Sequence, residues 1–322
     1  MIISKTPFRV SLFGGSTDYK SFYSRFGSLL SGFSINKYTY ISVRKTPAIL
    51  DYKTRLAYSK TEIVDNHSDI KHDGIRGVLE YCKVLFGIDL IHVCDLPAQT
   101  GIGSSSSFIV GLLNSIYQIK GIEKSRKELA TEAIFIEREL LAEVGGVQDQ
   151  IWAAYGGFNS IHIDKKGSFE VKPLPVSEEF KEDFVSRSVL IYTGKTRKSF
   201  KISNSHDRKE NDDIRKRLLD LSHEAYDAFL KSDINEIGRL LGNAWETKKE
   251  ISNLISKKHV ELLHSKLKSD GMIGGKLIGS GGSGFIFGVM KEGFDPEEIK
   301  AKYSENYISF DIEEDGSKII NY

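Results

Sequence analysis

Residues 96–107 of this chain read Leu96-Pro97-Ala98-Gln99-Thr100-Gly101-Ile102-Gly103-Ser104-Ser105-Ser106-Ser107. A strand-like run at residues 88–93 precedes this stretch, and a helical pattern with its apolar residues on one face follows it. Glycines let the backbone fold closely around a phosphate, and the free N–H groups and positive dipole end of a helix N-terminus attract one. The stretch therefore predicts an anion cradle, to which the serines add hydroxyl donors and candidate magnesium ligands.

This cradle is not a Walker A loop, because serines and no lysine follow Gly103. Taken alone, a stretch rich in serine and glycine would also fit a flexible loop. The stretch resembles the second motif of the GHMP kinases, the family of small-molecule kinases that contains galactokinase, homoserine kinase and mevalonate kinase. The resemblance implies nucleotide binding by Pro97, Gly101, Ile102, Gly103, Ser104, Ser105 and Ser106.

Composition sets broad limits on the kind of protein. The 322 residues suggest about two domains, and 40% hydrophobic with 28% charged residues is typical of a globular chain. A net charge of +1 gives no reason to expect a nucleic-acid or membrane surface, and residues 96–119, although uncharged, begin too polar for a membrane span. The N-terminus lacks the apolar core of a signal peptide, and the two cysteines, Cys82 and Cys94, indicate no disulfide framework. We therefore expect a cytoplasmic protein.

The order of elements is mixed. Strand-like runs at residues 8–13, 38–43, 88–93 and 158–163 alternate with helical patterns at 73–86, 105–119 and 126–141. After a strand at 188–192, the chain turns helical at 212–231, 234–241 and 257–268, and closes with strand, glycine loop, strand, helix and strand. The change predicts an α+β protein with domains at 1–176 and 177–322, divided near Val176.

Residues 7–19 read Pro7-Phe8-Arg9-Val10-Ser11-Leu12-Phe13-Gly14-Gly15-Ser16-Thr17-Asp18-Tyr19, a strand that ends in a glycine turn and presents a carboxylate. From the residues alone, Asp18 could be an ordinary turn residue and Arg9 an exposed strand cation. The segment is similar to the first motif of galactokinase-type GHMP kinases. That similarity implies that Arg9 lies beside the reacting hydroxyl and that Asp18 accepts hydrogen bonds from a sugar, with Gly14, Gly15 and Ser16 as further substrate contacts.

Gly15 and Ser16 depart from the galactokinase pattern, in which a Glu-His pair stands and its acid reads a hydroxyl at the far end of the hexose. Their small side chains leave room, and the missing negative charge removes repulsion against a substrate that carries its own phosphate. The departure therefore disfavours galactose as the substrate.

A third segment begins at Glu137 and runs through Gly145-Gly146-Val147-Gln148-Asp149-Gln150 to Tyr155. The two glycines end one helix, and Asp149 falls in the first turn of the next, where the helix dipole favours a carboxylate. Without further support, Asp149 could be a simple N-terminal acid and Glu137 an exposed one. The segment resembles the GHMP stretch that supplies the catalytic aspartate, which implies a catalytic role for Asp149, Mg²⁺ binding by Glu137 with Ser105, and a substrate contact by Tyr155.

The fourth segment is Lys276-Leu277-Ile278-Gly279-Ser280-Gly281-Gly282-Ser283-Gly284-Phe285-Ile286-Phe287-Gly288-Val289. Its glycines also satisfy the Gly-x-Gly-x-x-Gly pattern of a dinucleotide-binding oxidoreductase. However, residues 285–289 read as a strand, whereas that fingerprint requires a helix. The segment instead resembles the third GHMP motif, which implies that Gly279, Ser280, Gly281, Gly282 and Ser283 close on the site.

Phosphoryl transfer needs a phosphate cradle, a metal and a group that orients the attacking hydroxyl, and these segments offer all three. The resemblance implies the two-domain GHMP kinase fold, with an N-terminal ribosomal protein S5 domain 2-like part and a C-terminal ferredoxin-like part, and ATP and Mg²⁺ as cofactors.

Residues 192–197 and 245–249 look most like the sugar 1-kinase branch, which contains L-fucokinases and heptose 7-phosphate kinases. The expected reaction is phosphorylation of a heptose 7-phosphate at C1, for surface polysaccharide synthesis, with Lys195 and Arg197 holding the distal phosphate. A free-sugar kinase of the same family and a non-catalytic binding protein with this fold are the alternatives, and a homodimer is left open.

Overall fold

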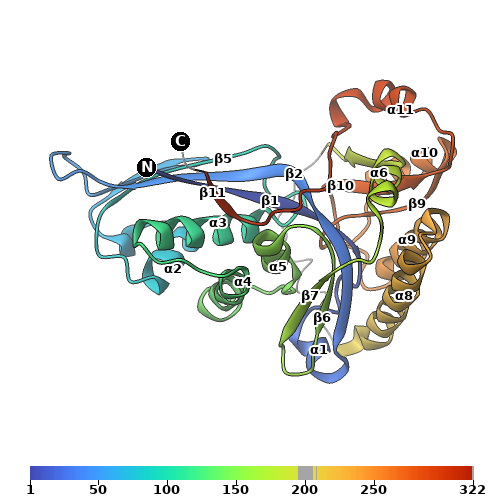
Figure 1. The fold of residues 1–322 in the computed structure, drawn as a ribbon, viewed down its shortest axis with the longest axis horizontal. Coiled ribbons are helices and arrows are strands. Elements are labelled where there is room, and N and C mark those ends of the chain that lie inside the picture. The colour runs from blue at the N-terminus through green and yellow to red at the C-terminus, as the bar shows by residue number, and fades with distance from the viewer. Residues whose placement is uncertain (195–205, 208, 321–322) are drawn as a thin grey trace.

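The computed structural model describes residues 1–194, 206–207 and 209–320, and these form two sheets with helices packed on them (Figure 1). Within these residues the first sheet has eight strands in the order β11-β1-β2-β5-β3-β4, with β6 paired to β2 and β7 to β6. All neighbours are antiparallel except β3 and β5. The strands are β1 (Ile2–Phe13), β2 (Ser28–Lys45), β3 (Thr54–Ala57), β4 (Thr61–Val64), β5 (Ile88–Cys94), β6 (Phe158–Ile163), β7 (Phe169–Pro173) and β11 (Lys318–Ile320). The four strands predicted for the first half of the chain are therefore confirmed.

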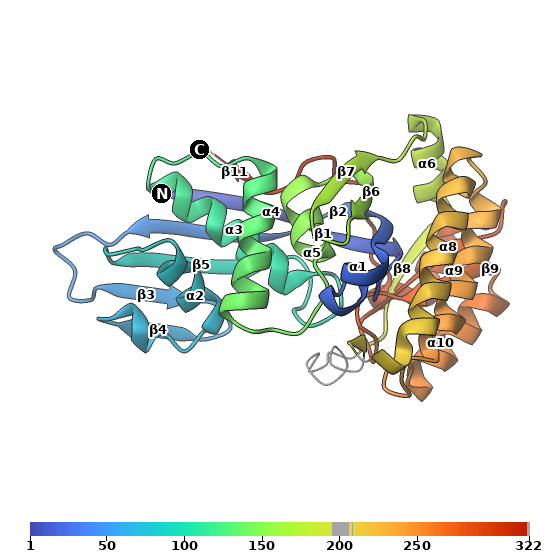
Figure 2. The same ribbon diagram turned by 90° about the horizontal axis from the view of Figure 1, so that it is seen from below.

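Helices cover one face of this sheet, as Figures 1 and 2 show. They are α2 (Asp73–Tyr81), α3 (Ser104–Ile119), α4 (Arg126–Phe135) and α5 (Gln148–Tyr155), and a short α1 (Lys20–Phe26) follows the N-terminal glycine turn. The prediction of a helix over 73–86 was too long, because the chain leaves helical geometry at Lys83, whose φ is 49°. The prediction over 126–141 also needs correction, because the α-helix changes to a π-helical turn at Ile136–Leu140.

The second sheet has the order β8-β10-β9 and is antiparallel. Its strands are β8 (Ser188–Tyr192), β9 (Met272–Leu277) and β10 (Phe285–Met290), and the helices around it are α6 (Glu178–Ser186), α8 (Asp212–Leu230), α9 (Ile234–Lys249), α10 (Lys258–Ser269) and α11 (Pro296–Tyr303). The glycine loop after β9 thus leads into a strand, which confirms that prediction and excludes the dinucleotide-binding interpretation of its glycines.

The last strand of the described residues lies in the first sheet. Residues Lys318–Ile320 form β11 and pair with β1 (Figure 1). The C-terminal strand therefore belongs to the sheet of the N-terminal part, although the division drawn from the sequence places all of 177–322 in the C-terminal domain.

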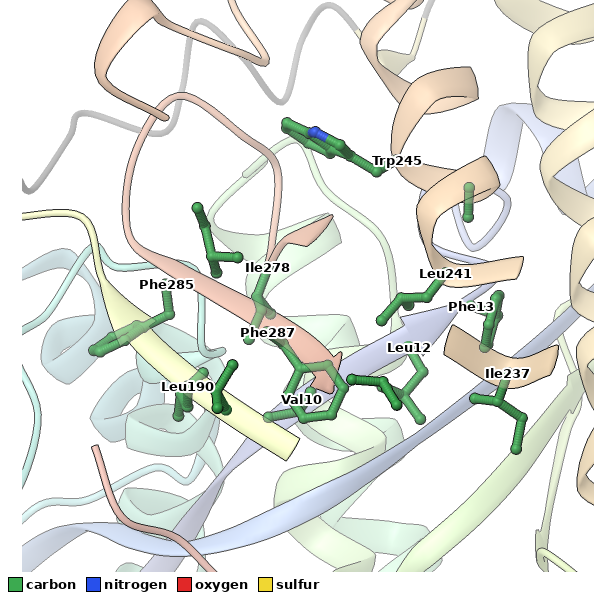
Figure 3. Close-up of a cluster of buried hydrophobic side chains, with 14 of the residues drawn as sticks. Val10, Leu12, Phe13, Leu190, Ile237, Leu241, Trp245, Ile278, Phe285 and Phe287 are labelled. Carbon is green, nitrogen blue, oxygen red and sulfur yellow. The ribbon is translucent and has the colours of Figure 1, made fainter. Parts of the chain in front are cut away.

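A cluster of buried hydrophobic side chains lies between the two sheets and contains residues of both. Figure 3 shows Val10, Leu12 and Phe13 of β1 among side chains of α9 and β10, including Leu241 and Phe287, and all of these are buried. Burial of apolar side chains from both parts fixes the end of β1 against the second sheet. Among the described residues, no helix combines the length and apolar character that crossing a membrane would need.

Candidate active site

The glycine-rich segments meet at one cavity of about 390 Å³, a size typical of small-molecule sites. Residues as far apart in the chain as Arg9 and Gly279 share its wall. The predicted site residues that line it are Arg9, Gly15, Ser16, Asp18, Gly101, Gly103, Ser104, Ser105, Ser106, Glu137, Asp149, Gly279 and Ser280.

The glycine loop leads directly into a helix N-terminus at the cavity. Gly103 precedes α3 with a φ of 76°, and the first residue of the helix is Ser104. The unpaired N–H groups of this first turn and the positive end of the helix dipole therefore lie at the cavity wall. The loop and helix N-terminus that the sequence predicted are therefore present, and their role as an anion cradle remains a prediction.

Arg9 and Asp149 form the polar centre of the site. Nε and Nη2 of Arg9 lie 2.8 and 2.6 Å from Oδ1 of Asp149, and Nη1 donates to the Gly101 carbonyl at 2.7 Å. The side chain of Arg9 is 4% exposed and that of Asp149 is 26% exposed. The arginine therefore fixes the carboxylate next to the phosphate cradle, while the carboxylate remains accessible from the cavity.

Asp18 is a buried carboxylate beside this centre. Its Oδ1 accepts from the N–H of Ser16 at 3.1 Å, and its Oδ2 accepts from the N–H and Nε2 of Gln148 at 3.2 and 3.0 Å. Burial, followed by the charge of Asp149, raises the pKa of Asp18. A Cβ on Gly146 would lie 1.9 Å from Oδ2 of Asp18, so only glycine allows this approach.

Two buried polar atoms near Asp18 lack a hydrogen-bond partner among the described residues. They are Oγ of Ser11 and Oε1 of Gln148, and both side chains line the cavity. A Cβ on Gly15 would lie 3.7 Å from Ser11 Oγ and from Gln148 Nε2, so the two side chains share one part of the wall. Buried polar atoms without partners are costly, and a ligand with hydroxyl groups would satisfy both of them.

Glu137 lies in the π-helical turn and is 1% exposed. Oγ of Ser106 donates to its two oxygens at 2.9 and 3.1 Å, Nε2 of Gln150 donates to Oε2, and Arg138 Nη2 lies 3.3 Å from Oε2. Burial raises the pKa of Glu137 to about 7. Arg138 supplies one positive charge beside this buried carboxylate, and the cavity gives a second cation access to it.

The third glycine loop packs against the first. A Cβ on Gly279 would lie 2.5 Å from Cα and O of Gly101, so the two backbones touch only because glycine stands there. His206 joins this loop to the N-terminal turn, since its Nδ1 lies 2.8 Å from Ser16 Oγ and its Nε2 lies 2.8 Å from the Ser280 carbonyl. The C-terminal part thus completes the cavity.

Some predicted site residues do not line the cavity. The ring of Tyr155 packs against Phe169 of β7, with ring centroids 6.3 Å apart, because Tyr155 lies on the opposite side of α5 from Asp149. Lys195 and Arg197 lie outside the described residues. The others that the structure leaves off the wall are Gly14, Pro97, Ile102, Gly281, Gly282 and Ser283, which occupy turns, the exposed surface or the core beside it.

Sequence reasoning also missed residues on the wall. These include Gln148, His206, Lys248 and Lys276, to which no role was assigned. A lysine within the otherwise apolar strand β9 was a usable signal, because a charge is rarely placed in a buried strand without a role. No local pattern distinguished His206.

Aromatic side chains line another part of the wall. The ring of Phe108 lies 5.1 and 4.8 Å from the rings of His72 and His92, and Thr39 Oγ1 lies 2.7 Å from His92 Nε2. Burial lowers the pKa of His92 to about 4, so this histidine is neutral at pH 7. The result is an aromatic part of the wall at which His92 carries no charge.

Strand β1 runs along the cavity, so the order of its residues gives the order of the parts of the wall. Thr6 pairs with Thr39 at the aromatic part, Arg9 follows, and Ser11 lies farther along. At about 3.3 Å per residue, Thr6 and Ser11 are roughly 16 Å apart. The cavity wall therefore has an aromatic end, a polar centre at Arg9 and Asp149, and a second end near Ser11, Ser16 and His206.

Comparison with known proteins agrees with this geometry. The model of the GHMP kinases N terminal domain matches residues 72–157, and that of the GHMP kinases C terminal matches residues 225–309. The D-glycero-alpha-D-manno-heptose 7-phosphate kinase of Campylobacter jejuni is 27% identical over 89% of this chain and 88% of its own. The bifunctional fucokinase/GDP-fucose pyrophosphorylase of Arabidopsis thaliana is 26% identical over 68% of this chain and 21% of its own.

Among solved structures, a D-glycero-D-manno-heptose 1-phosphate kinase from Bacteroides thetaiotaomicron superposes with a TM-score of 0.82 and 24% identity, over 100% of this chain and 99% of that one. This likeness establishes the fold. The two domain matches show that the chain belongs to the GHMP kinase family, and with the relative from Campylobacter jejuni they identify it as a sugar kinase that transfers a phosphoryl group from ATP to an alcohol.

Proposed function

We propose that this kinase phosphorylates the anomeric C1 hydroxyl of D-glycero-D-manno-heptose 7-phosphate, giving the 1,7-bisphosphate for GDP-heptose and surface polysaccharide (capsule or lipopolysaccharide) synthesis. The observation that carries the proposal is the Arg9–Asp149 pair at the polar centre of the cavity. The pair lies between the first glycine loop and the end of the cavity near Ser11 and Ser16, where the sugar would bind. The relative from Campylobacter jejuni supports the choice of sugar.

In this proposal Asp149 orients the attacking hydroxyl and accepts its proton. Arg9 holds the carboxylate through two contacts of 2.8 and 2.6 Å, and its positive charge stabilises the negative charge that develops during transfer. The Gly101–Ser106 segment and the N-terminus of α3 hold the phosphates of the nucleotide. The uncharged aromatic end, with Phe108, His72 and His92, accepts the base.

Magnesium fits the oxygen ligands at the first turn of α3. Mg²⁺ usually binds through one or two carboxylates, waters and substrate phosphates, and Glu137 with the hydroxyl of Ser105 offers such a set beside the cradle. Burial raises the pKa of Glu137 to about 7, and a bound cation would add a second positive charge to that of Arg138 and favour the ionised carboxylate. When bound, the metal neutralises charge on the transferred phosphate. Ser106 and Gln150 hold the carboxylate in position by their hydrogen bonds.

The sugar occupies the end near Ser11 and Ser16 in this proposal. Asp18 and the unpartnered atoms of Ser11 and Gln148 offer acceptors and a donor to ring hydroxyls. The small residues Gly15 and Ser16 leave room for a substituent beyond C6. Lys195 and Arg197 remain predicted contacts of the distal phosphate.

The names of two relatives differ in the position of the phosphate that the sugar carries. The protein from Campylobacter jejuni is named a heptose 7-phosphate kinase, and the solved structure from Bacteroides thetaiotaomicron is named a heptose 1-phosphate kinase. The test is ADP release with MgATP across heptose 7-phosphate, heptose 1-phosphate, free heptose, fucose, galactose and mevalonate. Turnover with the 7-phosphate is the predicted result. Preference for heptose 1-phosphate or a free sugar would show that the proposed substrate is wrong. Absence of turnover with every one of these compounds would favour a non-catalytic binding protein.

A further inference from the structure

Two buried lysines lie at the sugar end of the cavity. Lys248 of α9 and Lys276 of β9 are each 5% exposed, and both line the wall. Nζ of Lys276 donates to the carbonyl of Leu12 at 2.7 Å, and Nζ of Lys248 donates to the carbonyl of Gly279. Both ammonium groups are thus held by backbone oxygens at the meeting point of β1 and the third glycine loop.

The charge of Lys276 is poorly compensated. Among the described residues no carboxylate lies within ion-pair distance of its Nζ, and the charged groups that face it are Lys248, Arg9 and Asp18. Burial, followed by Lys248 and then Arg9, lowers its pKa well below the usual value. Asp18 is the acid among them, and it already accepts hydrogen bonds from Ser16 and Gln148. A dianionic ligand would supply the missing countercharge.

The contact of Lys276 with Leu12 agrees with the far end of a bound sugar, and Lys248, which donates to the carbonyl of Gly279, lies between that end and the first glycine loop. Arg9 marks the reaction centre, and Leu12, which Lys276 contacts, lies three residues farther along β1, or about 10 Å. This separation is comparable to the length of a seven-carbon sugar. Ser16 lies at the same end with a φ of 82°, a strained conformation for serine that its hydrogen bond to His206 stabilises.

We propose that Lys248 and Lys276 form the subsite for the phosphate that the sugar already carries before the reaction. This inference rests on the proposed function and adds two specificity-determining residues to it. The subsite is built on a strand and a helix of the described structure and does not require Lys195 or Arg197. Lysine ammonium groups bind phosphate through charge-assisted hydrogen bonds, and the loss of one such contact weakens binding about 10- to 100-fold.

The test compares Lys276→Met and Lys248→Met with the control Lys249→Met. Lys249 is the neighbour of Lys248 on α9, but it pairs with Glu246 and Glu261 and does not line the cavity. We expect each of the first two variants to raise the KM for heptose 7-phosphate about 10- to 100-fold and to leave the KM for ATP within about 3-fold of wild type. The control should behave as wild type.

Inhibition by inorganic phosphate provides a second readout. Each variant is compared with the wild-type enzyme, which must be folded and active. Inorganic phosphate should inhibit the wild type competitively against heptose 7-phosphate, and this inhibition should weaken in Lys248→Met even if Lys276→Met does not fold. A KM for ATP that rises while the KM for the sugar stays constant would overturn the subsite, as would undiminished phosphate inhibition in the folded variants. Absence of wild-type turnover with heptose 7-phosphate would instead overturn the proposed function.

Discussion

Replacing Asp149 by asparagine removes the charge at the centre of the site and changes little else. Asparagine has the same shape, so the contacts with Arg9 at 2.8 and 2.6 Å can persist as hydrogen bonds from the guanidinium to a neutral amide oxygen. The carboxylate proposed to accept the proton of the sugar hydroxyl is lost. The glycine loop and the first turn of α3, which would hold ATP, are not altered.

The expected loss of turnover follows from that chemistry. General-base assistance contributes about 10²- to 10⁴-fold, or about 3 to 5 kcal/mol of activation free energy. Stability should fall by a smaller amount, about 1 to 3 kcal/mol, because Arg9 is 4% exposed and loses its ionic partner, while Asp149 is 26% exposed and its pairing is partly screened by solvent.

The assay measures kcat by ADP release, ATP affinity by calorimetry and the free energy of unfolding by urea denaturation. Asp213→Asn is the matched control, because Asp213 is 94% exposed and pairs with Lys216 on the surface of α8. We expect Asp149→Asn to bind ATP within about 3-fold of wild type while kcat falls at least 100-fold. A kcat within about 3-fold of the control value would refute the role assigned to Asp149.

Three further predictions follow from the same geometry. Gly146→Ala places a Cβ that would lie 1.9 Å from Oδ2 of Asp18, so the carboxylate must move. The KM for the sugar should then rise by up to about 100-fold while ATP binding stays intact. An unchanged KM would contradict the role of Asp18. Glu137→Gln should increase the Mg²⁺ concentration needed for half-maximal activity at least about 10-fold, and an identical Mg²⁺ titration would exclude Glu137 as a ligand. Burial lowers the pKa of Lys276 in the folded state. Between that lowered pKa and 10.5, the folded protein therefore binds fewer protons than the unfolded chain. The free energy of unfolding should rise with pH over this interval. Urea denaturation of Lys276→Met should show a smaller rise between pH 7 and 9, and parallel curves for the two proteins would disprove it.

Much of the fold could be predicted from local patterns. Residues 158–163 form β6 with the predicted bounds, because a short run rich in aromatic and β-branched residues after two glycines favours a strand. Phe285–Met290 forms β10 for the same reason. The π-helical turn at Ile136–Leu140 could not be predicted, since its hydrophobic pattern continues that of the preceding helix.

The site was predictable only in part. Arg9 and Asp149 are 140 residues apart, so only the family resemblance could bring them together. The resemblance implied a substrate contact by Tyr155, whereas its side chain does not line the cavity, because six residues along an α-helix from Asp149 correspond to a rotation of about 240° after one full turn. Lys276 could have been singled out as a lysine within an apolar strand, but its contact with Leu12, like that of His206 with Ser16, is a tertiary contact that no local pattern encodes.

The most direct test of the proposed reaction is the position of the new phosphate. Wild-type enzyme is incubated with MgATP and heptose 7-phosphate, and the product is examined by ³¹P and ¹H NMR. We predict a second phosphate signal whose phosphorus couples to the anomeric proton, as expected for the 1,7-bisphosphate. Unchanged heptose 7-phosphate, together with conversion of heptose 1-phosphate at C7, would contradict the proposal.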